Sequence, residues 1–257
     1  MNGIDDKILS LLFYPLKYLE NHHGSNSIRK TIIYNKKSKK VLIILPQWMG
    51  RSWLYSKLIK KLKNKYTLVI YQLPNDLLNE NPHKVLKKFL EAKEDIIKTV
   101  HHLKSKGIKE FSILGTSLST ALVFMVINAD KSFRKIIVGF PGSYLSKSFW
   151  ESNQLLVNHI RKKMETNGTN LIKLSEYWKP LEPINNIKNI KDRKLYIYLA
   201  KNDRITPYKY GLELLDKMKN EKIYFYPYID NTFGHYISGL KQLLFPDKII
   251  KFLEAQH

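Results

Sequence analysis

Short apolar runs alternate with longer amphipathic stretches along most of this chain, and this alternation limits the fold more than any other feature of the sequence. The apolar runs predict strands, and the stretches with apolar residues every three or four positions predict helices. The expected strands cover residues 28–34, 41–45, 67–71, 111–114, 135–140, 195–200 and 223–229. Strands that alternate with helices favour a mostly parallel central sheet flanked by helices, an α/β fold.

The segments between and after these strands predict helices with recognisable ends. Helical spacing covers residues 52–63, 85–106, 121–129 and 239–254. Gly107 follows the longest of them, at a position where glycine commonly ends a helix, and Pro246 predicts a break in the last. The lysine-rich residues 36–40 predict a hairpin turn between the first two strands.

The alternation stops between residues 144 and 191. This stretch contains helical patterns interrupted by Asn167–Gly168, Pro180 and Pro183, and it contains no good strand. We therefore expect a single domain over residues 1–257, with residues 144–191 as a helical insertion. Within this insertion, Trp150 and Trp178 are expected to hold the helices together, with substrate contact as the alternative.

Composition excludes several classes of protein. No apolar run approaches the roughly 20 residues that span a bilayer, so an integral membrane protein is not expected. Residues 8–19 predict an amphipathic helix, broken near Pro15, that packs on the body of the fold or contacts a membrane surface. Because no signal peptide is evident, a cytoplasmic location is expected. The absence of cysteine excludes disulfides, cysteine-ligated metals and a thiol nucleophile.

The formal net charge of +22 comes mostly from lysines spread along the chain in short groups. Such a spread is typical of solvated faces, and no arginine-rich stripe or nucleic-acid motif accompanies it. We therefore expect no specific nucleic-acid partner, and at most a weak attraction to anionic surfaces.

The sequence I-L-G-T-S-L-S, residues 113–119, lies where an expected strand meets an expected helix. A serine flanked by Gly115 and Ser119 can occupy a tight turn, because small residues let the backbones approach. Such a turn would expose the Ser117 hydroxyl and direct the Leu118 backbone N–H towards an oxyanion formed there. The alternative is a buried corner that only caps the helix.

Two other side chains are expected at the same edge of the sheet. Asp203 follows the strand at 195–200, and His235 follows the strand at 223–229. The carboxyl ends of parallel strands meet at one edge, so both side chains can meet Ser117. Serine, histidine and a carboxylate are the groups needed to form an ester, carry its proton and orient the imidazole.

With these residues in this order, the sequence resembles the α/β-hydrolase family from about residue 28 to the C-terminus. The resemblance implies that Ser117 is the nucleophile, Asp203 the acid and His235 the base, and that the insertion at residues 144–191 is a helical cap. It also implies that Trp48 donates a second backbone N–H beside Leu118, with Gln47 as the alternative. Two positions depart from the family pattern. Ser119 replaces the usual last glycine of G-x-S-x-G, and P-Q-W-M-G at residues 46–50 replaces H-G-x-x-G.

Other candidate sites carry less weight. The pairs His101–His102 and His22–His23 have no partners at metal-binding spacing and are expected to be exposed. No glycine-rich phosphate loop is present, so no cofactor or metal is expected. Trp48 is expected to wall the pocket, or to pack with Trp53 between the loop and the cap.

The sequence therefore predicts a serine hydrolase that cleaves a carboxylic ester, or a thioester, of a small apolar substrate through an acyl-enzyme. An acyltransferase or a peptidase with the same residues remains open. A non-catalytic binding protein is the third alternative, because the oxyanion loop is altered.

Overall fold

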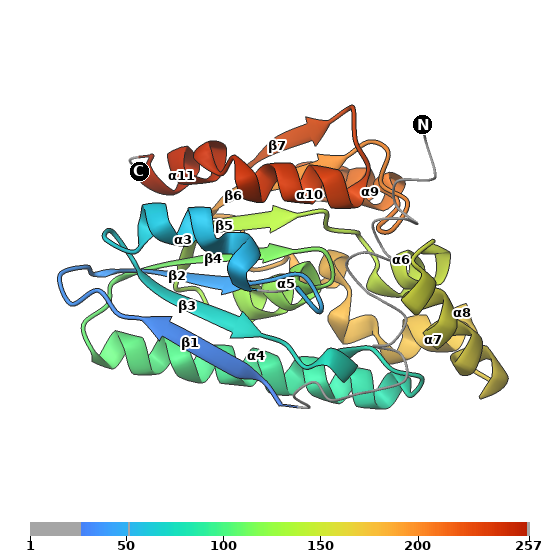
Figure 1. The fold of residues 1–257 in the computed structure, drawn as a ribbon. Coiled ribbons are helices and arrows are strands. Elements are labelled where there is room, and N and C mark those ends of the chain that lie inside the picture. Colours follow the sequence, from blue (N-terminus) through green and yellow to red (C-terminus); the bar gives the residue numbers. More distant parts are fainter. Residues whose placement is uncertain (1–26, 51, 256–257) are drawn as a thin grey trace.

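The computed structural model describes residues 27–50 and 52–255 and contains a seven-stranded sheet with the order β1-β3-β2-β4-β5-β6-β7 (Figure 1). Every neighbouring pair is parallel except β1 and β3. The strands are β1 (Arg29–Ile33), β2 (Lys40–Leu45), β3 (Thr67–Gln72), β4 (Glu110–Thr116), β5 (Phe133–Gly139), β6 (Lys194–Ala200) and β7 (Phe225–Asp230). The expected mostly parallel sheet is therefore confirmed. The helix predicted over residues 8–19 and the pair His22–His23 lie outside the described residues.

The predicted hairpin between the first two strands is wrong. β1 pairs antiparallel with β3 at the edge of the sheet, with Arg29 opposite Gln72 and Ile33 opposite Leu68. The reason is burial: β2 is apolar on both faces and needs a neighbour on each side, whereas β1 is mostly exposed and suits an edge. The connection to β2 is held against the start of β3, where the Ser38 hydroxyl donates to the Lys65 carbonyl oxygen at 2.6 Å.

Alternate residues of the strands build two apolar cores, one on each face of the sheet. In β2, Val41, Ile43 and Leu45 pack with α4 (Pro82–Ser105), α5 (Ser119–Ala129) and α9 (Tyr208–Asn220). Leu42 and Ile44 pack on the other face with α3 (Ser56–Leu62), α10 (His235–Leu244) and α11 (Asp247–Glu254). Figure 1 shows α3, α10 and α11 in front of the sheet and α4 behind it.

The helix ends follow the expected local signals. Asn81 caps α4 by accepting hydrogen bonds from the N–H groups of His83 and Lys84, and Gly107 follows its end with φ of +83°. The predicted break in the last helix is confirmed, because Phe245 and Pro246 separate α10 from α11. The segment from residue 52 begins as the 3₁₀ turn η1 (Ser52–Tyr55) before α3, and the short turn η2 (Asn75–Leu77) follows β3.

The cap residues form helices between β5 and β6 and contain no strand. They comprise α6 (Leu145–Glu151), α7 (Leu155–Thr166), α8 (Leu171–Tyr177), η3 (Lys179–Leu181) and η4 (Pro183–Asn186). Figure 1 shows α6, α7 and α8 beyond the end of the sheet towards which β2, β4 and β5 point.

Two sets of contacts hold the cap. The Ile184 N–H donates to the Ser143 carbonyl oxygen at 3.0 Å, which joins the two ends of the insertion. Trp178 is fully buried, donates through its indole N–H to the Pro82 carbonyl oxygen at 3.1 Å and packs edge-on against Phe149. Trp178 is thus a core residue, as the sequence favoured. None of the described helices combines the length and apolarity needed to cross a bilayer.

Candidate active site

Ser117 occupies a strained turn between β4 and α5. Its φ is +56°, a left-handed conformation that costs a residue with a side chain of order 1 kcal/mol. The turn is held from two sides. The Ser117 N–H donates to the Gly139 carbonyl oxygen of β5 at 2.8 Å, and the Ser117 carbonyl oxygen accepts from the N–H and hydroxyl of Thr120 at 2.9 and 2.7 Å.

The two small residues around Ser117 have different roles. At Gly115 a Cβ atom would lie 2.4 Å from Cγ2 of Val123, so the close approach of β4 and α5 requires glycine. Ser119 is fully buried, and its hydroxyl donates to the Pro46 carbonyl oxygen in the loop after β2. The side chain of Ser119 therefore ties the start of α5 to that loop.

Asp203 is buried just beyond the end of β6. Its Oδ1 accepts from the backbone N–H groups of Ile205 and Thr206 at 2.9 and 2.8 Å. Its Oδ2 lies 2.7 Å from Nδ1 of His235. The backbone bonds fix one carboxylate oxygen and leave the other directed at the imidazole.

His235 is the first residue of α10 and lies between Asp203 and Ser117. Its Nε2 is 3.0 Å from the Ser117 hydroxyl oxygen, and its ring packs on Phe140 with centroids 4.7 Å apart. With Nδ1–H donated to Asp203, Nε2 presents a lone pair to the serine hydroxyl. The structure thus brings Ser117, His235 and Asp203 into one hydrogen-bonded chain.

A second buried carboxylate, Asp230, was not predicted from the sequence. It ends β7, and its oxygens accept from the Thr232 N–H at 2.9 Å, the Tyr198 hydroxyl at 3.0 Å and the Lys241 ammonium at 3.1 Å. Burial alone would raise the pKa of Asp230, but these hydrogen bonds outweigh it and lower the pKa. Asp230 fixes the loop that carries His235, and its position at a strand end was the available signal.

The loop after β2 contains both candidates for the second oxyanion donor. The Gly50 N–H donates to the Gln47 carbonyl oxygen at 2.7 Å, and Met49 has φ of +58°. The Gln47 backbone also hydrogen-bonds the Tyr55 hydroxyl, where it lowers a pKa that burial raises to about 12. Trp48 and Leu118 both line the pocket beside Ser117.

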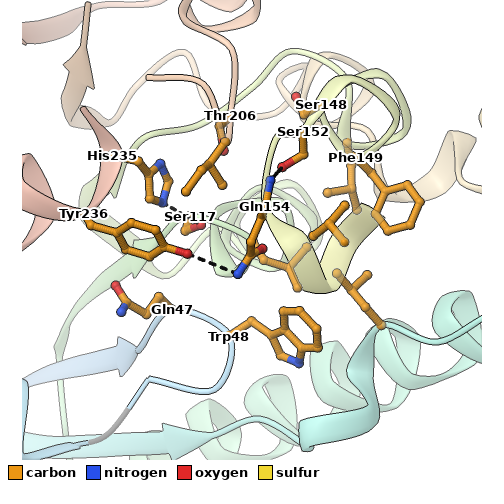
Figure 2. Close-up of a pocket in the computed structure, with 15 residues that line it drawn as sticks. Gln47, Trp48, Ser117, Ser148, Phe149, Ser152, Gln154, Thr206, His235 and Tyr236 are labelled. Carbon is orange, nitrogen blue, oxygen red and sulfur yellow. Dashed lines mark hydrogen bonds between the residues drawn. The ribbon is translucent and has the colours of Figure 1, made fainter. Parts of the chain in front are cut away.

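The pocket above Ser117 is narrow, with a volume of about 60 Å³, and the cap forms one of its walls (Figure 2). Its apolar lining comes from Trp48, Leu78, Leu118, Leu145, Phe149, Val157 and Ile205. Its polar lining, beyond Ser117 and His235, comes from Gln47, Ser148, Ser152, Gln154, Thr206 and Tyr236.

The tryptophans expected near the pocket differ in position. Trp48 lines it, with its indole N–H donated to the Asn75 carbonyl oxygen at 2.9 Å. The alternative in which Trp53 packs between the loop and the cap does not hold, because Trp53 is 61% exposed. Neither Trp150 nor Trp178 is among the described residues that line the pocket.

Outside this pocket, the histidine pair on α4 is exposed, as expected: His101 and His102 lie on its solvent face. Within residues 27–50 and 52–255, no three histidine, aspartate or glutamate side chains are grouped to hold a metal ion.

Comparison with known proteins finds similarity in structure but not in sequence. No protein-family model matches the chain, and no curated protein matches its sequence. An acylaminoacyl peptidase from Pyrococcus horikoshii superposes with a TM-score of 0.66 at 15% identity, over 94% of this chain and 44% of that one. A carboxylesterase structure from Nitrososphaera gargenis gives 0.58 at 14% identity, over 89% and 95%. A Pyrococcus furiosus esterase gives 0.59 at 16% identity, over 85% and 82%. This chain therefore spans less than half of the peptidase and nearly all of the carboxylesterase.

Proposed function

The chain has the α/β-hydrolase fold, and on that premise we propose that it is a serine hydrolase that cleaves a carboxylic ester, or a thioester, of a small substrate. One observation carries the proposal. The Ser117 hydroxyl lies 3.0 Å from Nε2 of His235, whose Nδ1 lies 2.7 Å from Asp203, at the base of a narrow pocket.

In the first half of the reaction, the Ser117 hydroxyl oxygen attacks the carbonyl carbon while Nε2 of His235 takes its proton. The buried Asp203 carboxylate stabilises the imidazolium and keeps Nδ1–H directed at itself. The carbon–oxygen or carbon–sulfur bond to the leaving group then breaks. His235 returns the proton to the departing oxygen or sulfur, and the acyl group remains on Ser117.

In the second half, water attacks the acyl carbon and gives its proton to His235. The bond to Ser117 breaks, the proton returns to the serine oxygen, and the acid leaves. In both halves the backbone N–H groups of Leu118 and Trp48 stabilise the negative oxygen of the tetrahedral intermediate.

A peptidase is the second candidate, because the same groups can cleave an amide. The superposition on the Pyrococcus horikoshii acylaminoacyl peptidase favours it, although this chain spans only 44% of that protein. Ester and amide substrates with the same acyl group separate the two candidates.

The direct test is labelling with a fluorophosphonate, followed by intact mass. The wild type should gain one label, and Ser117→Ala should gain none and lose at least about 10³-fold in kcat on any ester that the wild type cleaves. Ser112→Ala, which changes a buried serine of β4, the strand that precedes Ser117, is the matched control and should still be labelled. A folded wild type without label, or a labelled Ser117→Ala, would contradict the proposal.

A further inference from the structure

We infer that Gln154 recognises an amide group that the substrate carries beside its reacting carbonyl. The inference rests on the proposed function and narrows its substrate class, since the apolar lining alone would suit a plain hydrocarbon ester. Gln154 lies in the cap, immediately before α7, and Figure 2 shows its side chain pointing into the pocket.

The carboxamide of Gln154 is buried, and it makes fewer hydrogen bonds than its donors and acceptor allow. The residue is only 7% exposed, and the single side-chain hydrogen bond it makes among the described residues runs from Nε2 to the Tyr236 hydroxyl at 3.1 Å. A carboxamide has two N–H donors and an oxygen that accepts two bonds. One donor and the oxygen therefore remain for a ligand, and a secondary amide offers an acceptor and a donor, either of which can pair with one of them.

The side chain of Gln154 does not cap the helix that follows it. It is the N-cap residue of α7, where a side chain commonly accepts from the helix, yet its side chain makes no such bond. The backbone is fixed independently. The Gln154 N–H donates to the Ser152 hydroxyl at 3.3 Å, and its carbonyl oxygen accepts from the Asn158 N–H at 2.9 Å. The side chain is thus available for another partner.

The same segment is held in register with the catalytic residues. The Asn153 N–H donates to the carbonyl oxygen of Arg204, the residue after Asp203, at 3.2 Å. Tyr236, which receives the Gln154 bond, directly follows His235. The carboxamide is therefore positioned before the substrate binds, in the same pocket as Ser117.

This arrangement discriminates between substrates. A hydrocarbon chain would leave both the buried donor and the buried acceptor of Gln154 unpaired, whereas an amide would pair at least one of them. Sites built to hydrogen-bond a substrate reject analogues that lack the polar group. We expect Gln154 to contribute a preference of at least about tenfold in kcat/KM for the amide-bearing substrate.

The test compares the p-nitrophenyl esters of N-acetylglycine and of 4-methylpentanoic acid, which have the same branched shape and differ in the amide. The measured quantity is the ratio of their kcat/KM values, after subtraction of hydrolysis in buffer, in the wild type and in Gln154→Met. Because both proteins are assayed with the same two esters, the intrinsic reactivity of the esters cancels when their ratios are compared. Gln72→Met, an exposed glutamine at the end of β3, is the control for the substitution itself.

Gln154→Met should lower the ratio at least about tenfold through the N-acetylglycine ester, with hydrolysis of the 4-methylpentanoate ester retained. Tyr236→Phe, which removes the partner of the carboxamide, should lower the ratio in the same direction and serves if Gln154→Met fails to fold. An unchanged ratio in a folded variant would overturn the inference but leave the hydrolase proposal intact. A folded wild type that cleaves neither ester and takes no fluorophosphonate would overturn both.

Discussion

The hydroxyl of Ser119 links the two positions at which this chain departs from the family pattern. Ser119 stands where the family usually has glycine, and its hydroxyl donates to the carbonyl oxygen of Pro46, the first residue of the altered loop. A glycine at position 119 could not make this bond. The two departures therefore meet in one hydrogen bond, between the turn that contains Ser117 and the proposed oxyanion loop.

Ser119→Ala should destabilise the protein and slow the reaction. It leaves the buried Pro46 carbonyl oxygen without this donor, which should cost about 1–3 kcal/mol in the free energy of unfolding measured in urea. A looser oxyanion loop should lower kcat about tenfold with KM nearly unchanged, because the loop acts on the transition state. Ser238→Ala is the control, since the Ser238 hydroxyl is buried without a hydrogen bond among the described residues and does not line the pocket. Equal losses in the two variants would argue against the link.

The sequence pattern predicted Ser117, Asp203 and His235 as residues of the candidate site, but it did not indicate Asp230. The three predicted residues follow strands in a recognisable order, whereas Asp230 depends on Tyr198 and Lys241, which come from other elements. Gln154 was missed because a single glutamine in a cap has no sequence signal. The spacing of residues along the sequence does not show which residues of distant elements contact one another.

Helix α6 supplies Leu145, Ser148 and Phe149 to the pocket and is anchored at its first turn by Glu182. The Glu182 carboxylate accepts from the Leu145 N–H, and from the Ser146 hydroxyl at 2.6 Å. Burial raises the pKa of Glu182 to about 7, and these hydrogen bonds only partly oppose it. The anchor of the cap therefore gains or loses a proton near neutral pH.

Glu182 should make the stability of the protein fall as the pH rises. A pKa raised from 4.5 to about 7 favours the protonated native state, so its contribution is complete below pH 4.5 and is lost as the pH rises through about 7. The free energy of unfolding of the wild type, relative to Glu182→Gln, should fall by up to about 3 kcal/mol over this window. Urea unfolding at several pH values measures it.

Glu176→Gln, which changes an exposed glutamate of the neighbouring helix α8, is the matched control for this experiment. Its stability relative to the wild type should not vary in the same window. A wild type and Glu182→Gln with parallel pH profiles would contradict the assigned role of Glu182.

The strands that are buried on both faces of the sheet could be predicted from the sequence. The strands β2 and β6 are continuous apolar runs after their first lysine, and such runs are typical of the inner strands of a parallel sheet. The pairing of β1 was not predictable, because a short exposed strand next to a turn is equally suited to a hairpin and to the edge of a sheet.

The whole molecule has 44 basic and 22 acidic residues, so like charges repel one another over its surface. Lys135 illustrates the effect: burial lowers the pKa of its ammonium group, and the nearby Lys40 and Lys194 lower it further. Net repulsion of this kind opposes the compact state and is screened by salt.

Salt should therefore stabilise this protein. Between about 0.02 and about 0.5 M sodium chloride, Tm should rise by a few degrees, since screening weakens net repulsion more than it weakens the scattered surface ion pairs. Thermal unfolding by circular dichroism measures the change, with an uncharged osmolyte at equal osmolality as the control. A Tm that falls with salt would show that ion pairs such as Lys30–Asp95 and Lys88–Asp76 dominate instead.

The two ends of the cap meet at the hydrogen bond between Ser143 and Ile184, and the strands on either side, β5 and β6, are already paired with each other. The insertion consequently leaves and re-enters the fold at almost one point. Residues between these two points can therefore vary in number while the pairing of β5 with β6 is kept. The strand pairing of the sheet and the length of the segment inserted into it are thus separable.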